Sequence, residues 1–214
     1  MKSIAMQKKL YLASQSVQRK RLMQEAGLEF EVLAQDADEK SCDWGMPLQK
    51  LTCRLAQLKM DHSFPPTSSQ ENERCWIVTA DSLCIDKNGE ILGKPRDYSD
   101  AIRMVKLIRQ GTVAGTGFCI ERRIWRDGLW HSEERYVGYN YGECVLDIPD
   151  EFIEWYFKKL KEISNLDYLK LSGGFSITGF GAQFLKSVGG SYTGILGLPL
   201  YDVRIGLKEL GFFD

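Results

Sequence analysis

The sequence has no apolar run that approaches the roughly 20 residues of a transmembrane helix, and it has only two histidines, His62 and His131. Its first residues, MKSIAMQKKLYL, lack the long apolar core that precedes the cleavage site of a secretory signal. Six cysteines are scattered without a C-x-x-C pair, so a zinc site of the His/Cys type is not expected. We therefore expect no membrane partner, and the scattered thiols favour a cytoplasmic protein.

The chain also lacks a strong net charge, because 28 Lys and Arg residues are balanced by 29 Asp and Glu residues. The formal net charge of -1 argues against a nucleic-acid partner, and the basic residues are scattered among acidic ones. With 214 residues, of which 43% are hydrophobic, the chain can bury a sizeable core. That length suits either one large domain or two small lobes.

Hydrophobic residues recur with helical spacing in some segments and alternate in others. Strands are predicted over 10–13, 28–34, 76–80, 112–125 and 129–146, with turns at Asn88-Gly89 and Asp127-Gly128. Helices are predicted over 17–26, 48–60, 98–111, 151–161 and 201–210, with Ser16, Ser99 and Asp150 as N-caps and Gly27, Gly111 and Gly211 as terminators. Residues 61–75 and 172–181 are predicted loops. Because helices, strands and hairpins interleave, we expect an α/β fold with a mixed central β-sheet flanked by helices.

Two hydroxyls and an arginine follow the first predicted strand in LYLASQSVQRKRLM. Ser14, Ser16 and Arg19 would stand at the N-terminus of the next helix, where unpaired N–H groups suit a phosphate. Arg19 could add a bidentate contact to such an anion. A capped surface helix with solvated cations is the alternative, and it is the commoner meaning of this pattern alone.

Carboxylates occur at two further places that could hold a divalent cation. Asp36, Asp38 and Glu39 form an acidic stretch, which could bind magnesium together with waters and phosphates or could be a solvated loop. Asp81 follows the apolar strand 76–80, where it could bind metal, act as a general base or cap a turn. Lys94, between Gly93 and Pro95, and Lys59 could hold a phosphate as point charges.

Six stretches in one order, from residue 10 to about 210, resemble the Maf family of nucleoside triphosphate pyrophosphatases, which is related to the Ham1/inosine triphosphatase fold. They are LASQSVQRKRL, DADEK, LAQLK, TADSLCIDKNGEILGKP, SGGFSITGFG and GSYTGILGLPL. The resemblance implies one Maf-like domain over residues 1–214, with two lobes and a cleft between them. It implies cleavage between the α and β phosphates of a nucleoside triphosphate, with Mg, Mn or Co as the divalent cation.

The resemblance also implies roles for individual residues. Asp81 matches the catalytic base of the family and a metal ligand, and either Asp38 or Glu39 matches a second metal ligand. Ser14, Arg19, Lys59 and Lys94 match positions that contact the triphosphate. The family further implies a possible homodimer, and its alternative role is a nucleotide-binding regulator linked to septum formation.

The chain departs from the family at four positions. Val17 stands where proline is usual, and Gln18, Ser82 and Thr178 stand at the positions that select the nucleobase. One branch of the family acts on thymidine and uridine triphosphates and tends to carry Arg, Thr and Gln there. A branch that acts on 7-methyl-GTP tends to carry Trp, Gln and Glu. This chain has neither set, so the nucleobase stays open and modified or non-canonical nucleotides are expected substrates.

Overall fold

The computed structural model describes residues 8–214. Its α-helices are α1 (Val17–Glu25), α2 (Leu48–Asp61), α3 (Tyr98–Ile108), α4 (Asp150–Ser164), α5 (Tyr192–Ile195) and α6 (Leu200–Glu209). Its strands are β1 (Lys9–Leu12), β2 (Glu31–Val32), β3 (Arg74–Asp86), β4 (Ile91–Leu92), β5 (Thr112–Arg126), β6 (Leu129–Leu146) and β7 (Leu185–Gly190). Four short 3₁₀ helices join them: η1 (Glu39–Ser41), η2 (Tyr168–Lys170), η3 (Ser172–Gly174) and η4 (Gly179–Phe184).

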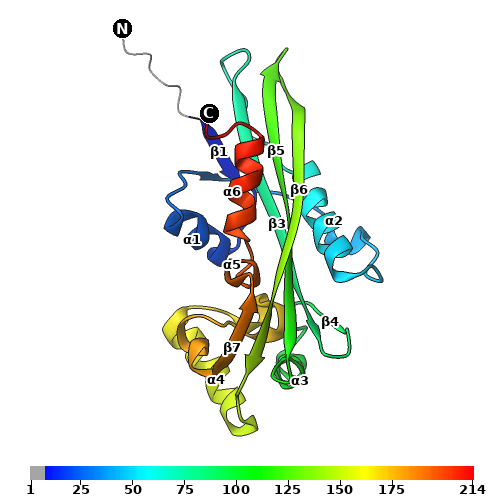
Figure 1. Ribbon diagram of the computed structural model, residues 1–214, viewed down its shortest axis with the longest axis vertical. Helices are drawn as coiled ribbons and strands as arrows, with labels where there is room; N and C mark the ends of the chain where they lie inside the picture. The colour runs from blue at the N-terminus through cyan, green and yellow to red at the C-terminus, as the bar shows by residue number, and fades with distance from the viewer. Residues whose placement is uncertain (1–7) are drawn as a thin grey trace. The chain divides into compact units, whose positions relative to one another are not determined.

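The strands form one mixed sheet in the order β2-β1-β3-β5-β6-β7, and β4 pairs with β3 (Figure 1). β1 runs parallel to both β2 and β3, whereas β4 and β7 are antiparallel to their partners. The predicted α/β fold with a mixed sheet flanked by helices is therefore confirmed. No helix formed by residues 8–214 combines the length and apolar character that crossing a membrane requires.

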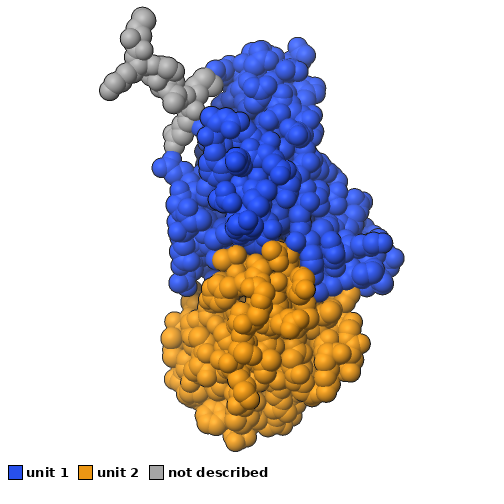
Figure 2. Space-filling view, in the orientation of Figure 1, with its two compact units in different colours: residues 1–81, 117–139, 197–214 blue, residues 82–116, 140–196 orange. Residues whose placement is uncertain are grey.

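The chain divides into two compact units, which Figure 2 colours separately. Unit 1 consists of residues 1–81, 117–139 and 197–214, and unit 2 consists of residues 82–116 and 140–196. Each unit is built from segments far apart in the sequence, because β3, β5 and β6 each contribute residues to both.

In unit 1, α2 and α6 lie on opposite faces of the strands. Neighbouring side chains of β5 contact one helix or the other. Cys119 packs in one hydrophobic cluster with Ala56 of α2, while Ile120 lies against Gly206 of α6. Successive side chains of a strand point to opposite faces. Gly117 has the same parity as Cys119, and any Cβ there would meet the backbone of α2 at Thr52.

Unit 2 has its own core between α3, α4 and the segment from η2 to η4. Its buried members include Val105 and Ile108 of α3 and Tyr156 and Leu160 of α4. Tyr156 is fully buried, stacks on Phe175 at 4.6 Å and accepts a hydrogen bond from the backbone N–H of Ser176 at 2.8 Å. That aromatic stack fixes the glycine-rich segment 172–181, which is a chain of short 3₁₀ turns rather than the plain loop expected.

Several predicted boundaries need correction. The strand expected to stop at Ala80 continues through Asp81 to Asp86, so Asp81 lies inside β3. The segment 28–34 pairs only at Glu31–Val32, and β7 was not expected. In the sequence, a polar residue after an apolar run looks like the end of a strand. The strand continues through it here because distant segments pair with its backbone, which the sequence does not show.

The helix caps were predicted with mixed success. Ser16 caps α1 through its hydroxyl, and Gly27 and Gly211, both with positive φ, follow the ends of α1 and α6 as expected. Asp97 rather than Ser99 caps α3, because its carboxylate accepts from the backbone N–H of Asp100 while the Ser99 hydroxyl donates to it. Pro149 is the N-cap position of α4, and the predicted cap Asp150 is its first residue.

Substitution of Gly117 by alanine should destabilise the protein by about 1–3 kcal/mol, since the added methyl would overlap the α2 backbone. The Cβ would lie 2.4 Å from Thr52 C and from Cys53 N. Chemical denaturation of Gly117→Ala beside Gly189→Ala measures this. The Gly189 site is open within 4 Å, so that control should change by less than about 0.5 kcal/mol. Equal effects of the two variants would contradict the packing described.

Candidate functional site

The turn between β1 and α1 is held by two serines. Ser14 is buried, and its Oγ accepts hydrogen bonds from Ser16 N and from Arg19 Nη1, each at 3.2 Å. Ser16 Oγ in turn accepts from the backbone N–H of Arg19 at 3.4 Å. With two donors on its oxygen, the Ser14 hydroxyl keeps its own proton to donate, which suits an anionic ligand.

The Arg19 guanidinium is oriented from the opposite end of the sequence. Its Nε donates to the carbonyl of Gly197 at 2.8 Å, across 178 positions. Burial lowers the pKa of Arg19, and the nearby carboxylates of Asp81 and Glu39 oppose that effect. The side chain stays cationic in either case, because a guanidinium is protonated at any physiological pH.

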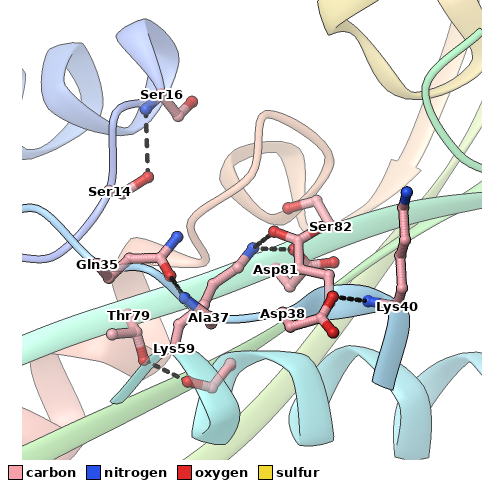
Figure 3. A network of polar contacts seen from close by, with 12 residues as sticks. Ser14, Ser16, Gln35, Ala37, Asp38, Lys40, Lys59, Thr79, Asp81 and Ser82 are labelled. Carbon is pink, nitrogen blue, oxygen red and sulfur yellow. Dashed lines mark hydrogen bonds and ion pairs between the residues drawn. The ribbon is translucent and has the colours of Figure 1, made fainter. Parts of the chain in front are cut away.

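A lysine and two carboxylates meet beside this turn. Lys59, in the last turn of α2, is only 6% exposed and donates a short hydrogen bond to Asp81 Oδ1. Its Nζ also lies 2.9 Å from Glu39 Oε1. Figure 3 shows the ammonium extending from α2 toward Asp81 of β3. All three residues belong to unit 1, as do Ser14 and Arg19.

Strand alternation explains why Asp81 faces α2. Ile77 packs in the cluster with Ala56, and the Thr79 hydroxyl donates to the Ala56 carbonyl at 2.7 Å. Asp81 has the same parity and so leaves the same face of β3. Asp81, a residue only 8% exposed, is stable there because the Lys59 ammonium neutralises its carboxylate.

The structure separates the two acidic candidates of the 36–39 stretch. Asp38 is exposed, and its Oδ1 accepts from the backbone N–H of Lys40, so this carboxylate caps η1 (Figure 3). Asp36 bonds to the His62 ring at 3.1 Å. Glu39 is the member of the stretch that reaches Lys59. The sequence could not choose between Asp38 and Glu39, because they are neighbouring carboxylates of the same chemical type.

Lys94 lies in unit 2, on a backbone held at both neighbours. Gly93 O accepts from Gly173 N at 3.0 Å, and Pro95 is buried. Lys94 itself is exposed. Arg96 donates its backbone N–H and its Nε to the buried carboxylate of Asp100 on α3, at 3.2 and 3.0 Å. The Gly-Lys-Pro frame that the sequence indicated is thus rigid and presents the lysine to solvent.

The three candidate base-selecting residues lie apart in the chain. Gln18 is in the first turn of α1, in unit 1, while Ser82 and Thr178 belong to unit 2. Ser82 Oγ pairs with Thr116 Oγ1 at 2.7 Å, and Thr178 Oγ1 pairs with Ser176 Oγ at 3.1 Å. The Thr116 hydroxyl donates its one proton to Gly194 O, so Ser82 must be the donor in its pair. Thr116 had no sequence signal, because both of its hydroxyl contacts are with residues far away in the chain.

The carboxylates suit a hard divalent cation bound jointly with substrate. Glu39 and Asp81 converge on one ammonium, so their oxygens already face a common cation position. Among residues 8–214, no group of three or more His, Cys, Asp or Glu side chains could hold a metal alone. Two carboxylates completed by waters and phosphate oxygens is the usual binding mode of magnesium.

The fold and this cluster define an α/β protein in which an arginine, a buried lysine and two carboxylates could bind a phosphate chain and its cation. The Maf-like protein family model matches residues 9–210, so the chain belongs to the Maf family.

Curated relatives align along nearly their whole length. A dTTP/UTP pyrophosphatase of Caldicellulosiruptor bescii is 29% identical over 218 residues, covering 96% of each chain. A nucleoside triphosphate pyrophosphatase of Prochlorococcus marinus is 29% identical, covering 94% of this chain and 97% of the relative. A dTTP/UTP pyrophosphatase of Citrifermentans bemidjiense is 31% identical, with 94% and 95% covered.

Stability should depend on pH through Asp100, which fixes the segment that carries Lys94. Hydrogen bonds from Arg96 and Arg103 lower the Asp100 pKa to about 2, so its charged form stabilises the fold above about pH 4. That contribution should fade as pH falls from about 4 to about 2. We expect the free-energy gap between wild type and Asp100→Asn to narrow over this range in urea titrations.

The exposed Asp147 of unit 2 provides the matched control for this prediction. Asp147→Asn should show no gap at any pH. A gap for Asp100→Asn that stays constant from pH 7 to pH 2 would contradict the assignment.

Proposed function

We propose that this chain is a metal-dependent nucleoside triphosphate pyrophosphatase that acts on modified or non-canonical nucleotides. The observation that carries the proposal is the cluster in unit 1 of the buried Lys59 and Asp81 with the half-buried Arg19 and Glu39, in a member of a family with relatives named pyrophosphatases. The reaction joins a water oxygen to the α-phosphorus and breaks the bond from that phosphorus to the bridging oxygen, which leaves with pyrophosphate.

In this proposal, Arg19 and Ser14 hold phosphate oxygens. The guanidinium is fixed by Gly197 and Ser14, so it is presented without searching rotamers. The Ser14 hydroxyl donates its proton to an oxygen of the same group. Pre-oriented donors of this kind stabilise the charge that builds on the phosphate in the transition state.

Asp81 acts as the general base in this scheme. It accepts a proton from the attacking water and holds the water oxygen toward the α-phosphorus. Lys59 then pairs with phosphate oxygens in place of Asp81, which its flexible stem allows. A divalent cation held by Glu39 and Asp81 would supply charge neutralisation of the phosphates. The roles of Lys94, Gln18, Ser82 and Thr178, of which three belong to unit 2, stay predictions from the resemblance.

Pyrophosphate release from a panel of nucleoside triphosphates tests the activity. The panel holds UTP, dTTP, pseudo-UTP, 5-methyl-UTP, 7-methyl-GTP, ITP and the standard set, each with magnesium, manganese or cobalt and with a chelator. UTP and dTTP are assayed first, because two of the relatives are named dTTP/UTP pyrophosphatases. We expect metal-dependent release from one or a few bases. No release from any of them, by folded protein that still binds nucleotide, would overturn the proposal.

Within the panel, Asp81→Asn should lower kcat by about 10²–10⁴-fold, because it removes the general base. Nucleotide binding, measured by calorimetry, should persist. Asp86→Asn is the matched control on the same strand, since Asp86 receives the backbone N–H groups of Asn88 and Glu90 at the following turn. It should keep turnover within a few-fold of wild type, and unchanged turnover of Asp81→Asn would exclude Asp81 as the base.

Metal affinity of the nucleotide-free protein should rise in Lys59→Met. The ammonium sits between Glu39 and Asp81 and competes with a cation for the same oxygens. We expect manganese, titrated with EPR detection, to bind Lys59→Met about tenfold more tightly than wild type, or ~1.4 kcal/mol. The exposed Lys40, next to Glu39, gives the control Lys40→Met, which should not change affinity. Equal or weaker binding by Lys59→Met would show that this carboxylate pair is not the metal site.

A further inference from the structure

The position of Lys59 depends on how the last turn of α2 is held. The last four carbonyls of a helix have no partner within the helix and need one elsewhere. Lys59 lies in that turn, two residues before the helix ends at Asp61. Its ammonium must meet both Glu39 and Asp81, so a small rotation of the turn would break one of these contacts.

Arg123 of β5 binds one carbonyl in the last turn of α2 and one just beyond the helix. Its Nη2 donates to Met60 O at 3.0 Å, and its Nη1 donates to Ser63 O at 2.7 Å. Ser63 then donates its hydroxyl to the carbonyl of Lys59 at 2.6 Å. One guanidinium therefore binds a carbonyl in the last turn of α2, which Ser63 N also contacts, and fixes Ser63, whose hydroxyl binds the Lys59 carbonyl.

Glu121 links this arginine to a second one on β6. Its carboxylate, in a residue only 1% exposed, accepts from Arg123 Nε and from Arg135. Arg135 Nη2 also lies 2.8 Å from Asp61 Oδ1, at the last residue of α2. Two arginines thus bind the end of α2, one at the Met60 carbonyl and one at the Asp61 side chain, and Glu121 binds both arginines.

Side chains of β5 alternate between two faces, and those of this network lie on the face that packs against α2, the helix that carries Lys59. Glu121 and Arg123 share the parity of Cys119, which packs against α2. Arg122, between them, instead donates to Leu210 O after α6 and pairs with Glu133. A matched pair of neighbouring arginines, one for each helix, is therefore built into the same strand.

We propose that Glu121 is a positioning residue for the reaction, because it fixes Arg123 and Arg135 and thereby holds the Lys59 ammonium at Glu39 and Asp81. The inference rests on the proposed function, since positioning matters through the chemistry of Lys59. Glu121 has no contact with Lys59, and its effect passes through the end of α2. A purely structural carboxylate would stabilise the whole of unit 1 and would not single out Lys59.

The first test needs no turnover. Lysine labelling with a small acylating reagent, read by mass spectrometry, should modify Lys59 slowly in wild type because the amine is buried and paired. Glu121→Gln and Arg123→Gln should raise its labelling rate at least tenfold, while Arg122→Gln should leave it within twofold. Hydrogen exchange on the same samples should quicken at residues 58–63 and stay unchanged in β1.

The outcomes of this first test decide between positioning and general stability. Unchanged labelling of Lys59 in both variants would overturn the proposal. Exchange that quickens equally in β1 and at the end of α2 would also overturn it, because it would show a global loss of stability. If Glu121→Gln does not fold, Arg123→Lys, which keeps the charge but loses one donor to the carbonyls, replaces it.

The second test is a double-mutant cycle on kcat/KM with the preferred nucleotide. Glu121→Gln should lower kcat/KM at least tenfold in the wild-type background and by less than twofold in Lys59→Met, because its effect passes through Lys59. Equal losses in the two backgrounds would overturn the proposal. If wild type hydrolyses no nucleotide, the proposed function fails, and the labelling test still decides whether Glu121 positions Lys59.

Discussion

A buried ammonium between two carboxylates is the interaction on which the site depends. Lys59 brings together Glu39, from a short 3₁₀ turn, and Asp81, from the middle of a core strand. Removing one partner from a buried ion pair leaves an uncompensated charge, which typically costs about 3–5 kcal/mol. The three residues are therefore coupled in stability. Any ligand that draws Lys59 away from the carboxylates must offer them another cation.

The rest of unit 1 keeps that lysine in place by dividing β5 between two helices. Odd-numbered residues from Gly117 to Arg123 face α2, and the residues between them face α6. Close approach at Gly117 sets the distance of α2 from the strand near the middle of the helix, and Arg123 holds its end. β5 thus sets the distance of α2 at Gly117 and binds the end of α2 at Arg123.

Local chemistry decided which parts could be predicted from the sequence. The Ser16 cap, the helix predicted over 48–60 and the Asp127-Gly128 turn depend on neighbours in the chain, and all three are found as expected. The predicted end of the strand at residue 80 was wrong. β3 continues to Asp86 because its polar residues pair with strands that are distant in the sequence.

The site shows the same division. The bond of Arg19 to Gly197 spans 178 positions, and that of Lys59 to Asp81 spans 22, so no local pattern pairs them. Residue types pointed to phosphate and metal chemistry. Only the structure shows that Glu39 contacts Lys59, whereas Asp38 caps η1. Val17 contributes a group at the site that belongs to the main chain. It is the first residue of α1, where proline would have no backbone N–H. With valine there, the N-terminal end of α1 keeps the Val17 N–H, a main-chain donor that no substitution other than proline removes.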